Sequence, residues 1–309
     1  MSNSASNNLF CFGYGYSCDW LGHALRAQGG WQMAGTTRDH DKRRHMKDHG
    51  IRAFLFDFDQ PLEDPLLFLR DTTHLLISTP PDDEGDPAYR LHADDILRLK
   101  NLQWVGYLSS TAVYGDRDGA WVDEDAERRP SSKRGSRRLK AEEQWLGLQR
   151  EYGLPVHVFR LAGIYGPGRS ALDSVRAGVA RRINKPGHAF SRTHVEDIVQ
   201  VLRASMNNLH PGRAYNIADD RAAPSYEVIE YACNLLGLTP PPLIPYDEAD
   251  LAPITRSFYA DNKRIKNDRI KQELGVVLRY PTFIEGLKAC LAMEQQEMPT
   301  ISLSGSSGE

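Results

Sequence analysis

The stretch FCFGYGYSCDWLGHAL, residues 10–25, joins an apolar run to a helical pattern through two glycines, Gly13 and Gly15. In a doubly wound α/β sheet, the first strand, turn and helix bind the pyrophosphate of a dinucleotide. One glycine permits the turn, a second admits the phosphates, and a third lets helix and strand pack closely. Cys18 stands at the third position, where a small buried side chain can fill the steric role. The stretch predicts a dinucleotide-binding turn with a weakened fingerprint; a purely structural turn is the alternative.

Short apolar runs alternate with helical patterns along the first half of the chain. Runs typical of buried parallel strands lie at 7–12, 31–38, 51–58, 73–81, 104–111 and 155–166. Helical patterns lie between them at 19–28, about 86–100 and about 134–152. This alternation predicts an α/β fold, a Rossmann-type doubly wound parallel sheet covered by helices on both faces.

The pattern changes after Pro167. Helices are expected at about 170–183, after a short strand within 188–206, at 225–237 and over much of 261–296, with a Pro-rich connection at 239–253. We therefore predict an NAD(P)-binding Rossmann domain at 1–167, a smaller C-terminal substrate-binding region at 168–297 and a disordered tail at 298–309. Segments after the boundary can still return to complete the sheet.

Composition excludes several classes of protein. The 309 residues are 40% apolar and 26% charged, as in ordinary soluble domains, and a net charge of −3 gives no bulk attraction to nucleic acid or membranes. The first eight residues lack the pattern of a signal peptide, and no apolar run is long enough to span a bilayer. Four cysteines without C-x-x-C spacing suit neither a zinc site nor a disulfide framework. We expect a cytoplasmic protein with no metal, nucleic-acid or membrane partner.

The end of the second strand bears on the choice of cofactor. It reads GTTRDHDKR, and Arg38 lies 23 residues after Gly15. An arginine can hold a ribose 2′-phosphate through several charge-assisted hydrogen bonds, so NADP(H) is favoured. Asp39 keeps NAD(H) open, because NAD sites usually place a carboxylate here. The alternative is that Arg38 and the basic stretch after it form a solvated loop.

Four later segments resemble the extended short-chain dehydrogenase/reductase superfamily, which includes nucleotide-sugar epimerases and dehydratases. They are YLSSTAVYG (107–115), RLAGIYGPGR (160–169), RTHVEDI (192–198) and YNIADD (215–220). Together with the opening turn they occur in the expected order over most of the chain, and this joint match is specific although no single segment is. The chain looks most like an atypical branch labelled NAD-dependent epimerase/dehydratase family.

The resemblance implies two sets of contact residues. Those expected at the cofactor are Gly13, Gly15, Tyr16, Ser17, Cys18, Thr37, Arg38, Thr79, Pro80, Ser109 and Arg138. Those expected at the substrate are Thr111, Tyr114, Arg134, Arg169 and Arg192. Arg169 and Arg192 suit an anionic substrate group, with a structural salt bridge as the alternative for each.

Catalysis in the resembled family begins with a hydroxyl at the end of the fifth strand, which hydrogen-bonds the reacting oxygen. Ser110 falls in that position, and its alternative is a hydroxyl bonded to its own loop. Dehydratases place Asp and Glu at the next two positions, where this chain has Thr111 and Ala112. Neither side chain can do carboxylate acid/base work, so sugar 4,6-dehydration is disfavoured.

The family's Tyr-x-x-x-Lys pair is replaced. Aligning the next helix through LKAEE puts Arg134 in the tyrosine position and Arg138 in the lysine position, and no tyrosine occurs between Tyr114 and Tyr152. Arginine is not deprotonated in proteins, so Arg134 cannot be the general base. Arg138 can still hold ribose hydroxyls or supply positive charge. A solvated basic helix face is the alternative for both.

Other groups are candidates for the vacant acid/base role. Tyr114, Tyr165 and His194 lie in the resembled segments, each with packing or a structural role as its alternative. The pair Tyr259 and Lys263 has the family's spacing but lies far past the fifth strand, so we interpret it as a chance match.

Two functions remain. The first is an NAD(P)-dependent oxidoreductase or epimerase, hence isomerase, acting on a small polar substrate such as a sugar or nucleotide sugar. Ser110, Tyr165 and Arg138 are then the catalytic candidates, with Tyr165 or water held by arginines carrying the proton. The second is a non-catalytic NADP(H)-binding sensor or regulator. An enzyme is favoured because YGPGRS and SRTHVEDI keep the family form. The resemblance also implies a homodimer formed through two helices.

Overall fold

A seven-stranded parallel sheet forms the centre of the protein. The computed structural model describes residues 7–297, and its strand order is β11-β7-β5-β4-β1-β2-β3. The strands are β1 (Asn7–Phe12), β2 (Trp31–Thr37), β3 (Arg52–Leu55), β4 (His74–Ile77), β5 (Trp104–Ser110), β7 (Val156–Leu161) and β11 (Ala214–Ile217). Every neighbouring pair is parallel. The predicted Rossmann-type α/β fold is confirmed, and the strand order reverses between β1 and β4.

Helices cover both faces of the sheet because alternate strand residues point to opposite sides. Leu9 and Cys11 of β1 pack in one core cluster with α1 (Tyr16–Gln28) and α7 (Val195–Asn207). Phe10 and Phe12 pack in the other with α4 (Pro87–Leu97) and α5 (Lys133–Tyr152). The remaining covering helices are α2 (His40–Asp48), α3 (Pro65–Leu69) and α10 (Asp268–Leu274).

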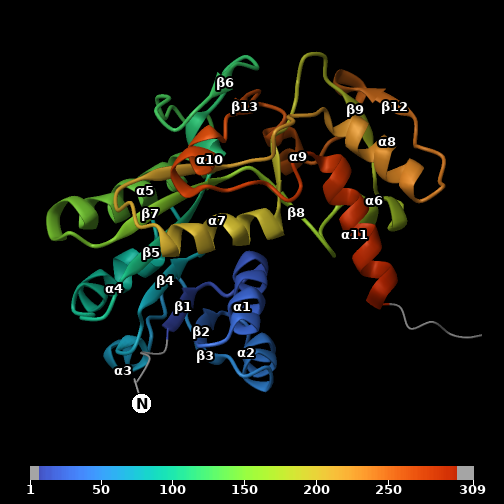
Figure 1. The fold of residues 1–309 in the computed structure, drawn as a ribbon. Coiled ribbons are helices and arrows are strands. Elements are labelled where there is room, and N and C mark those ends of the chain that lie inside the picture. Colours follow the sequence, from blue (N-terminus) through green and yellow to red (C-terminus); the bar gives the residue numbers. More distant parts are fainter. Residues whose placement is uncertain (1–6, 298–309) are drawn as a thin grey trace, which may run out of the picture.

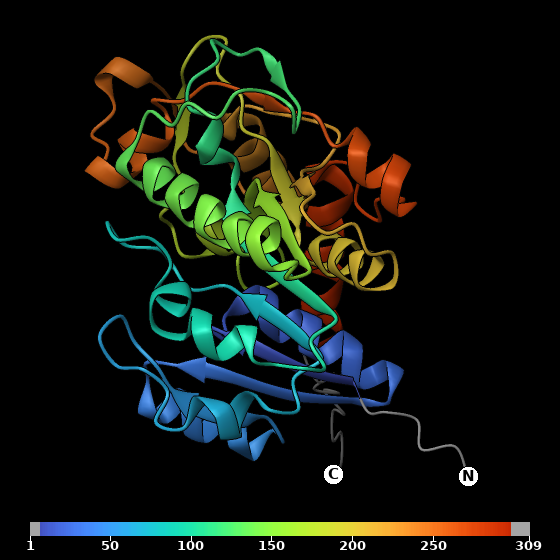
Figure 2. The same cartoon turned by 90° about the vertical axis from the view of Figure 1, so that its left-hand side faces the viewer.

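A second group of elements lies beyond β7 and β11. It contains the small parallel pairs β8 (Gly163–Tyr165) with β10 (Arg192–His194), β9 (Arg182–Asn184) with β12 (Leu243–Pro245), and β6 (Trp121–Val122) with β13 (Arg264–Ile265). Its helices and turns are α6 (Ala171–Arg176), α8 (Ser225–Leu235), α9 (Pro253–Phe258), α11 (Phe283–Glu297), η1 (Thr111–Tyr114) and η2 (Tyr246–Glu248). Figures 1 and 2 place most of this group at the opposite end of the molecule from the blue N-terminal strands, whereas α11 runs back toward the level of α1 in Figure 1.

Several predicted boundaries were wrong, each for a local reason. The run 155–166 is two strands, because the chain leaves the sheet at Ala162 and β8 pairs with β10 instead. The helix expected at 170–183 ends at Arg176, and Gly178 follows with a φ of +68°. The region 261–296 contains two helices with residues 275–282 between them.

Two further expectations concern the ends of elements. The basic stretch after Arg38 is a helix, α2, and not a loop, because the Asp39 side chain accepts hydrogen bonds from the amides of Asp41 and Lys42 and caps it. Strand β11 lies after residue 167 and completes the sheet next to β7. The predicted tail at 298–309 lies outside the described residues. No helix within residues 7–297 is long and apolar enough to cross a membrane.

Candidate functional site

The opening turn brings β1, β4 and α1 together. Gly13 has a φ of +80°, and a Cβ on it would lie 3.0 Å from the Thr79 amide nitrogen, so only glycine fits. A Cβ on Gly15 would approach nothing closer than 3.9 Å, which leaves the start of α1 open. Gly15 is the N-cap of α1 and offers no side chain to the first-turn amides. Such unpaired amides at a helix N-terminus form an anion site.

Cys18 occupies the position of the missing third glycine. Its side chain is fully buried in the core cluster between β1 and α1. Its Sγ donates a weak hydrogen bond to the Gly13 carbonyl oxygen at 3.4 Å. The thiol therefore packs behind the turn and ties the helix to it, and it does not enter the space where a phosphate would lie.

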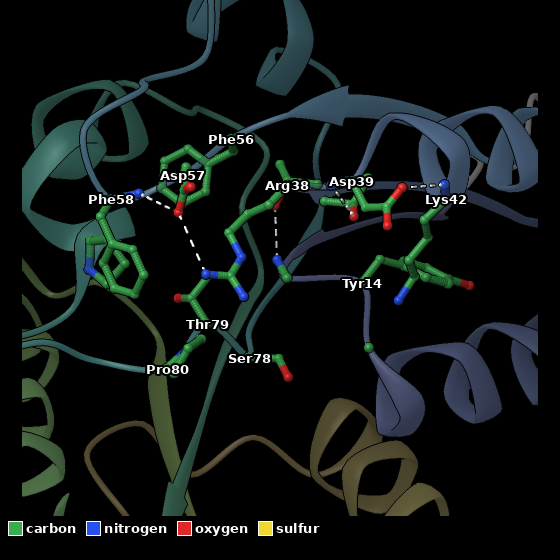
Figure 3. A pocket seen from close by; sticks show the side chains of 15 residues that line it. Tyr14, Arg38, Asp39, Lys42, Phe56, Asp57, Phe58, Ser78, Thr79 and Pro80 are labelled. Atoms are coloured by element: carbon green, nitrogen blue, oxygen red, sulfur yellow. Dashed lines mark hydrogen bonds and ion pairs between the residues drawn. The ribbon is translucent and has the colours of Figure 1, made fainter.

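A cavity of about 300 Å³ opens in front of this turn (Figure 3). It lies at the carboxyl ends of β1, β2, β3 and β4, where the strand order reverses. Its lining residues are Gly13, Tyr14, Gly15, Thr36, Thr37, Arg38, Asp39, Lys42, Phe56, Asp57, Phe58, Ser78, Thr79, Pro80 and Pro87. The crevice outside the strand ends at such a reversal is where doubly wound sheets bind nucleotides. We call it the adenosine cavity because its place corresponds to the adenosine half of a dinucleotide.

Two cations come into the adenosine cavity from the end of β2 and from α2. Figure 3 shows Arg38 reaching across the cavity toward Asp57; its Nη1 lies 3.9 Å from Asp57 Oδ1, and its side chain is 64% exposed. Lys42 lines the cavity from the first turn of α2. Asp39 is occupied as the cap of α2, and the Lys42 and Asp41 amides hold its pKa below its usual value.

The end of β5 carries the predicted hydroxyls. Ser110 is half-buried and accepts a hydrogen bond from the Ala112 amide at 3.2 Å, which caps η1. Thr111 is half-buried and starts that turn. Ser109 is buried and donates to Glu142 Oε1 at 2.5 Å. The structure therefore shows the bond from Ser110 to its own loop, and the hydroxyl retains its own proton for donation.

The two arginines of α5 have separate partners despite their i, i+4 spacing. Arg138 Nη1 donates to the Leu108 carbonyl oxygen at 2.7 Å and to the Tyr107 hydroxyl at 3.2 Å. Arg134 is exposed, and its guanidinium lies 5.1 Å from the ring centroid of Phe258 on α9. Arg138 therefore supports the end of β5, whereas Arg134 faces the second group of elements.

The candidate tyrosines are buried and hydrogen-bonded within the protein. The Tyr114 hydroxyl donates to Asn216 Oδ1 at 2.7 Å and accepts from Arg160 at 2.8 Å; burial raises its pKa to about 12. The Tyr165 hydroxyl donates to the Thr282 carbonyl oxygen at 3.4 Å, and burial raises its pKa as well. Both phenols hold their protons at neutral pH.

Four further predicted residues, Tyr16, Ser17, Arg169 and Arg192, do not line the adenosine cavity. The Tyr16 hydroxyl donates to the Pro167 carbonyl oxygen at 2.9 Å, and the Arg169 guanidinium lies 5.6 Å from the Tyr16 ring centroid. Ser17 is buried in the first turn of α1. Arg192 is half-buried and donates through Nη1 to the carbonyl oxygens of Phe190 and Ala223, both at 2.9 Å.

Of the predicted cofactor residues, the cavity brings six together, namely Gly13, Gly15, Thr37, Arg38, Thr79 and Pro80. Ser109 and Arg138 do not line it. Sequence reasoning missed Lys42 because the start of α2 was not recognised; Asp39, a good N-cap residue, was the available signal. It also missed Phe56, Asp57 and Phe58, although the carboxyl end of a third parallel strand was a predictable neighbour of the site.

Comparisons with known proteins agree with this architecture. A profile described as "NAD dependent epimerase/dehydratase family" matches residues 92–218. Protein YeeZ of Escherichia coli K12 is 28% identical over 274 residues, which cover 85% of this chain and 93% of YeeZ. A functionally unknown conserved protein from Silicibacter pomeroyi DSS is 49% identical with a TM-score of 0.86, covering 93% of this chain and 99% of that one.

A more distant structure shows the same fold. The dTDP-glucose 4,6-dehydratase of Bacillus anthracis strain Ames, solved in complex with NAD, has a TM-score of 0.74 over 94% of this chain and 97% of its own. The two sequences are 18% identical, so this likeness is one of fold alone. The matched profile starts at His92, after the opening turn, and the cofactor argument for that turn therefore rests on its geometry.

Proposed function

We propose, from the match of residues 92–218 to the NAD-dependent epimerase/dehydratase family, that the chain is a member of that family, binds NADP(H) and acts as an oxidoreductase or epimerase. Its proposed substrate is a small polar molecule, a sugar or nucleotide sugar. The observation that carries the proposal is the adenosine cavity, which joins the open start of α1 to Arg38 and Lys42. The amides at the start of α1 suit a pyrophosphate, and the two cations suit a further phosphate.

The preference for NADP(H) follows from the charges at the cavity. Among the described residues, Arg38 has one carboxylate within 4 Å, that of Asp57, at the long separation of 3.9 Å and with both side chains substantially exposed. Such an exposed ion pair is worth little, so a 2′-phosphate can take the guanidinium. Asp39, which would hold the ribose hydroxyls of NAD, has an oxygen committed to the cap of α2.

The chemical roles of the chain's own groups follow from their partners. A bound nicotinamide cofactor supplies the capacity to accept or donate a hydride. Ser110 keeps a free proton with which to hydrogen-bond the reacting oxygen of the substrate. Arg138 fixes the end of β5 on which Ser110 sits, through the Leu108 carbonyl. Because burial raises its pKa, Tyr165 would serve as a proton donor and not as a base at neutral pH; base work would fall to water held by arginines.

The second candidate function is a non-catalytic NADP(H)-binding sensor. This function is favoured because the hydroxyls of both candidate phenols, Tyr114 and Tyr165, donate hydrogen bonds to other groups of the protein. A sensor needs the adenosine cavity and no proton carrier. Hydride exchange separates the two functions: an enzyme transfers the cofactor's hydride to a carbonyl substrate, and a sensor binds both redox forms without consuming either.

The cofactor proposal is tested by titrating NADPH and NADH into the protein by fluorescence or calorimetry. We expect NADPH to bind at least tenfold more tightly, because the 2′-phosphate gains charge-assisted bonds worth about 1.5–3 kcal/mol. Arg38→Ala should remove most of this preference, leaving only the contribution of Lys42. Arg44→Ala is the matched control, since Arg44 is an exposed arginine of α2 that pairs with Asp41 and does not line the cavity. Equal affinities in the parent protein would contradict the proposal.

A further inference from the structure

The carboxyl edge of the sheet continues past the adenosine cavity. Strands β5, β7 and β11 follow β4 in order. Ser110 ends β5, Ala162 follows β7, and Asp219 lies two residues after β11 ends. Neighbouring strands are about 4.8 Å apart, so Asp219 lies along the same edge as Ser110, on the side away from the adenosine cavity. The proposed function leaves this part of the edge for the substrate.

Asp219 is unusual among the buried polar groups. Its side chain is 3% exposed, and within the described part of the chain neither carboxylate oxygen has a hydrogen-bond partner of normal geometry. A buried carboxylate without partners is costly and is retained only for a reason. Arg192 is the cation whose charge acts on Asp219, and its backbone carbonyl oxygen accepts a hydrogen bond from the Asp219 amide at 2.6 Å.

Arg192 does not form an ion pair with this neighbour. Its Nη1 is turned to the carbonyl oxygens of Phe190 and Ala223, and among residues 7–297 no carboxylate lies within 4 Å of the guanidinium. Its Nε and Nη2 make no hydrogen bond to the described residues. A half-buried guanidinium with free donors, next to an unpaired carboxyl group, is a fork for a planar or tetrahedral oxyanion.

The groups around Asp219 determine its protonation state and thereby the net charge of the Arg192 and Asp219 pair. Arg192 of β10 and the backbone amides of Arg192 and Arg221 lower the pKa of Asp219, while Asp220 raises it. Tyr165 faces both side chains from β8. Burial outweighs the rest and raises the pKa of Asp219 to about 8. At neutral pH the carboxyl group is therefore mostly uncharged, and Asp219 does not offset the positive charge of Arg192, on which Glu227 and Tyr259 also act.

Gly163 leaves room beside Arg192. This residue is exposed at the start of β8, and a Cβ on it would lie 3.7 Å from Arg192 Cγ. A larger side chain would extend along the arginine stem. The absence of a side chain at Gly163 leaves this side of the Arg192 stem uncovered by it.

We propose that Arg192 binds an oxyanion of the substrate, a carboxylate or a phosphate, and that Asp219 is a positioning residue that keeps this arginine net positive by holding a proton when the anion binds. The proposal rests on the proposed function for the place of the substrate, but the anion site is defined by its own residues. The proton comes from the solvent, so anion binding is linked to proton uptake where Asp219 is ionised.

The test is calorimetric titration of sodium sulfate and of sodium glucuronate into protein saturated with NADP⁺, at pH 7 and pH 9. Sulfate stands for a phosphate group without titrating in this range, and glucuronate stands for a sugar carboxylate. The parent protein should bind at least one probe at one site, about tenfold more weakly at pH 9, since the protonated fraction of a group with a pKa of about 8 falls about tenfold between the two. Arg192→Gln should weaken binding at least tenfold.

Two variants complete the test. Asp219→Asn, an uncharged side chain of the same shape, should bind the probe as the parent does at pH 7 and show no loss at pH 9. Arg221→Gln is the matched control, because this exposed arginine two residues from Asp219 pairs with Glu227, and its binding should equal the parent's. A probe bound equally by the parent protein and Arg192→Gln, or by neither, overturns the proposal. Equal affinity of the parent protein for the probe at pH 7 and pH 9 also overturns the proposal. This result does not depend on whether any variant folds.

The experiments distinguish failure of the proposed function from failure of the anion site. The preceding NADP⁺ titration shows whether the cofactor binds. If it does not, the anion titrations are repeated on cofactor-free protein, and the anion affinity of the parent protein is compared with that of Arg192→Gln. Cofactor binding without an Arg192-dependent anion site refutes the present inference alone.

Discussion

At the scale of single residues, the chain departs from the pattern of the family that it resembles in opposite ways at two positions. Cys18 replaces a glycine and preserves its role, because the thiol packs behind the turn and donates to Gly13. Arg134 replaces a tyrosine and cannot preserve its role, because a guanidinium does not give up a proton. The sequence allowed both conclusions. It did not reveal Asp219, because a carboxylate after a strand is ordinary and only burial without partners makes it unusual.

The burial of Asp219 predicts a pH dependence of stability. Its folded-state pKa of about 8 lies above the value of about 3.9 in an unfolded chain. The folded state then binds more protons between these values, so this group makes the protein less stable as pH rises from about 4 to about 8, with no further change above. Asp219→Asn removes this ionisation. The melting temperature of the variant, relative to that of the parent protein, should therefore rise between pH 5 and pH 9.

The control for this prediction is Asp220→Asn. Asp220 is the next residue and forms an exposed ion pair with Lys271. Its variant should therefore show no such pH-dependent rise in melting temperature relative to the parent protein. Melting curves of the parent and Asp219→Asn that shift in parallel with pH would refute the assigned ionisation.

At the scale of elements, α5 is held to the sheet by a buried charge network. Glu142 of α5 has no exposed surface and accepts hydrogen bonds from Ser109 of β5, Arg160 of β7 and Arg128. These contacts fix α5 against the strand that ends in Ser110. The sequence predicted the helix and both strands but gave no sign of the network, because it joins residues 33 and 18 positions apart.

Breaking this network should cost much of the protein's stability. Glu142→Ala leaves the Arg160 guanidinium buried without its counter-ion, and such losses cost about 3–5 kcal/mol. Glu143→Ala is the matched control, since Glu143 is a half-exposed neighbour that pairs with Arg128 and Arg150, and its loss should cost about 1 kcal/mol or less. Urea unfolding measures both. Similar losses for the two variants would show that the network carries no special stability.

At the scale of the whole molecule, the parallel sheet with helices on both faces was predictable from sequence. The apolar runs are continuous because both faces of the sheet are covered, and the parallel alternation then fixes which strand ends meet. The second group of elements was less predictable. Its strands are two or three residues long, too short for a periodic pattern, and Gly178 follows the early end of its helix α6. The protein contacts of candidate side chains such as Arg134 and Arg192 depend on these short elements, which is why the sequence did not reveal them.

The central claim is that the cavity at the strand reversal holds the adenosine end of NADP(H). A crystal structure of the protein grown with NADP⁺ tests it most directly. We predict the pyrophosphate against the first-turn amides of α1 beside Gly15, and the 2′-phosphate between Arg38 and Lys42. A structure from crystals saturated with NADP⁺ in which this cavity stays empty, or in which the nucleotide binds elsewhere, would contradict the account.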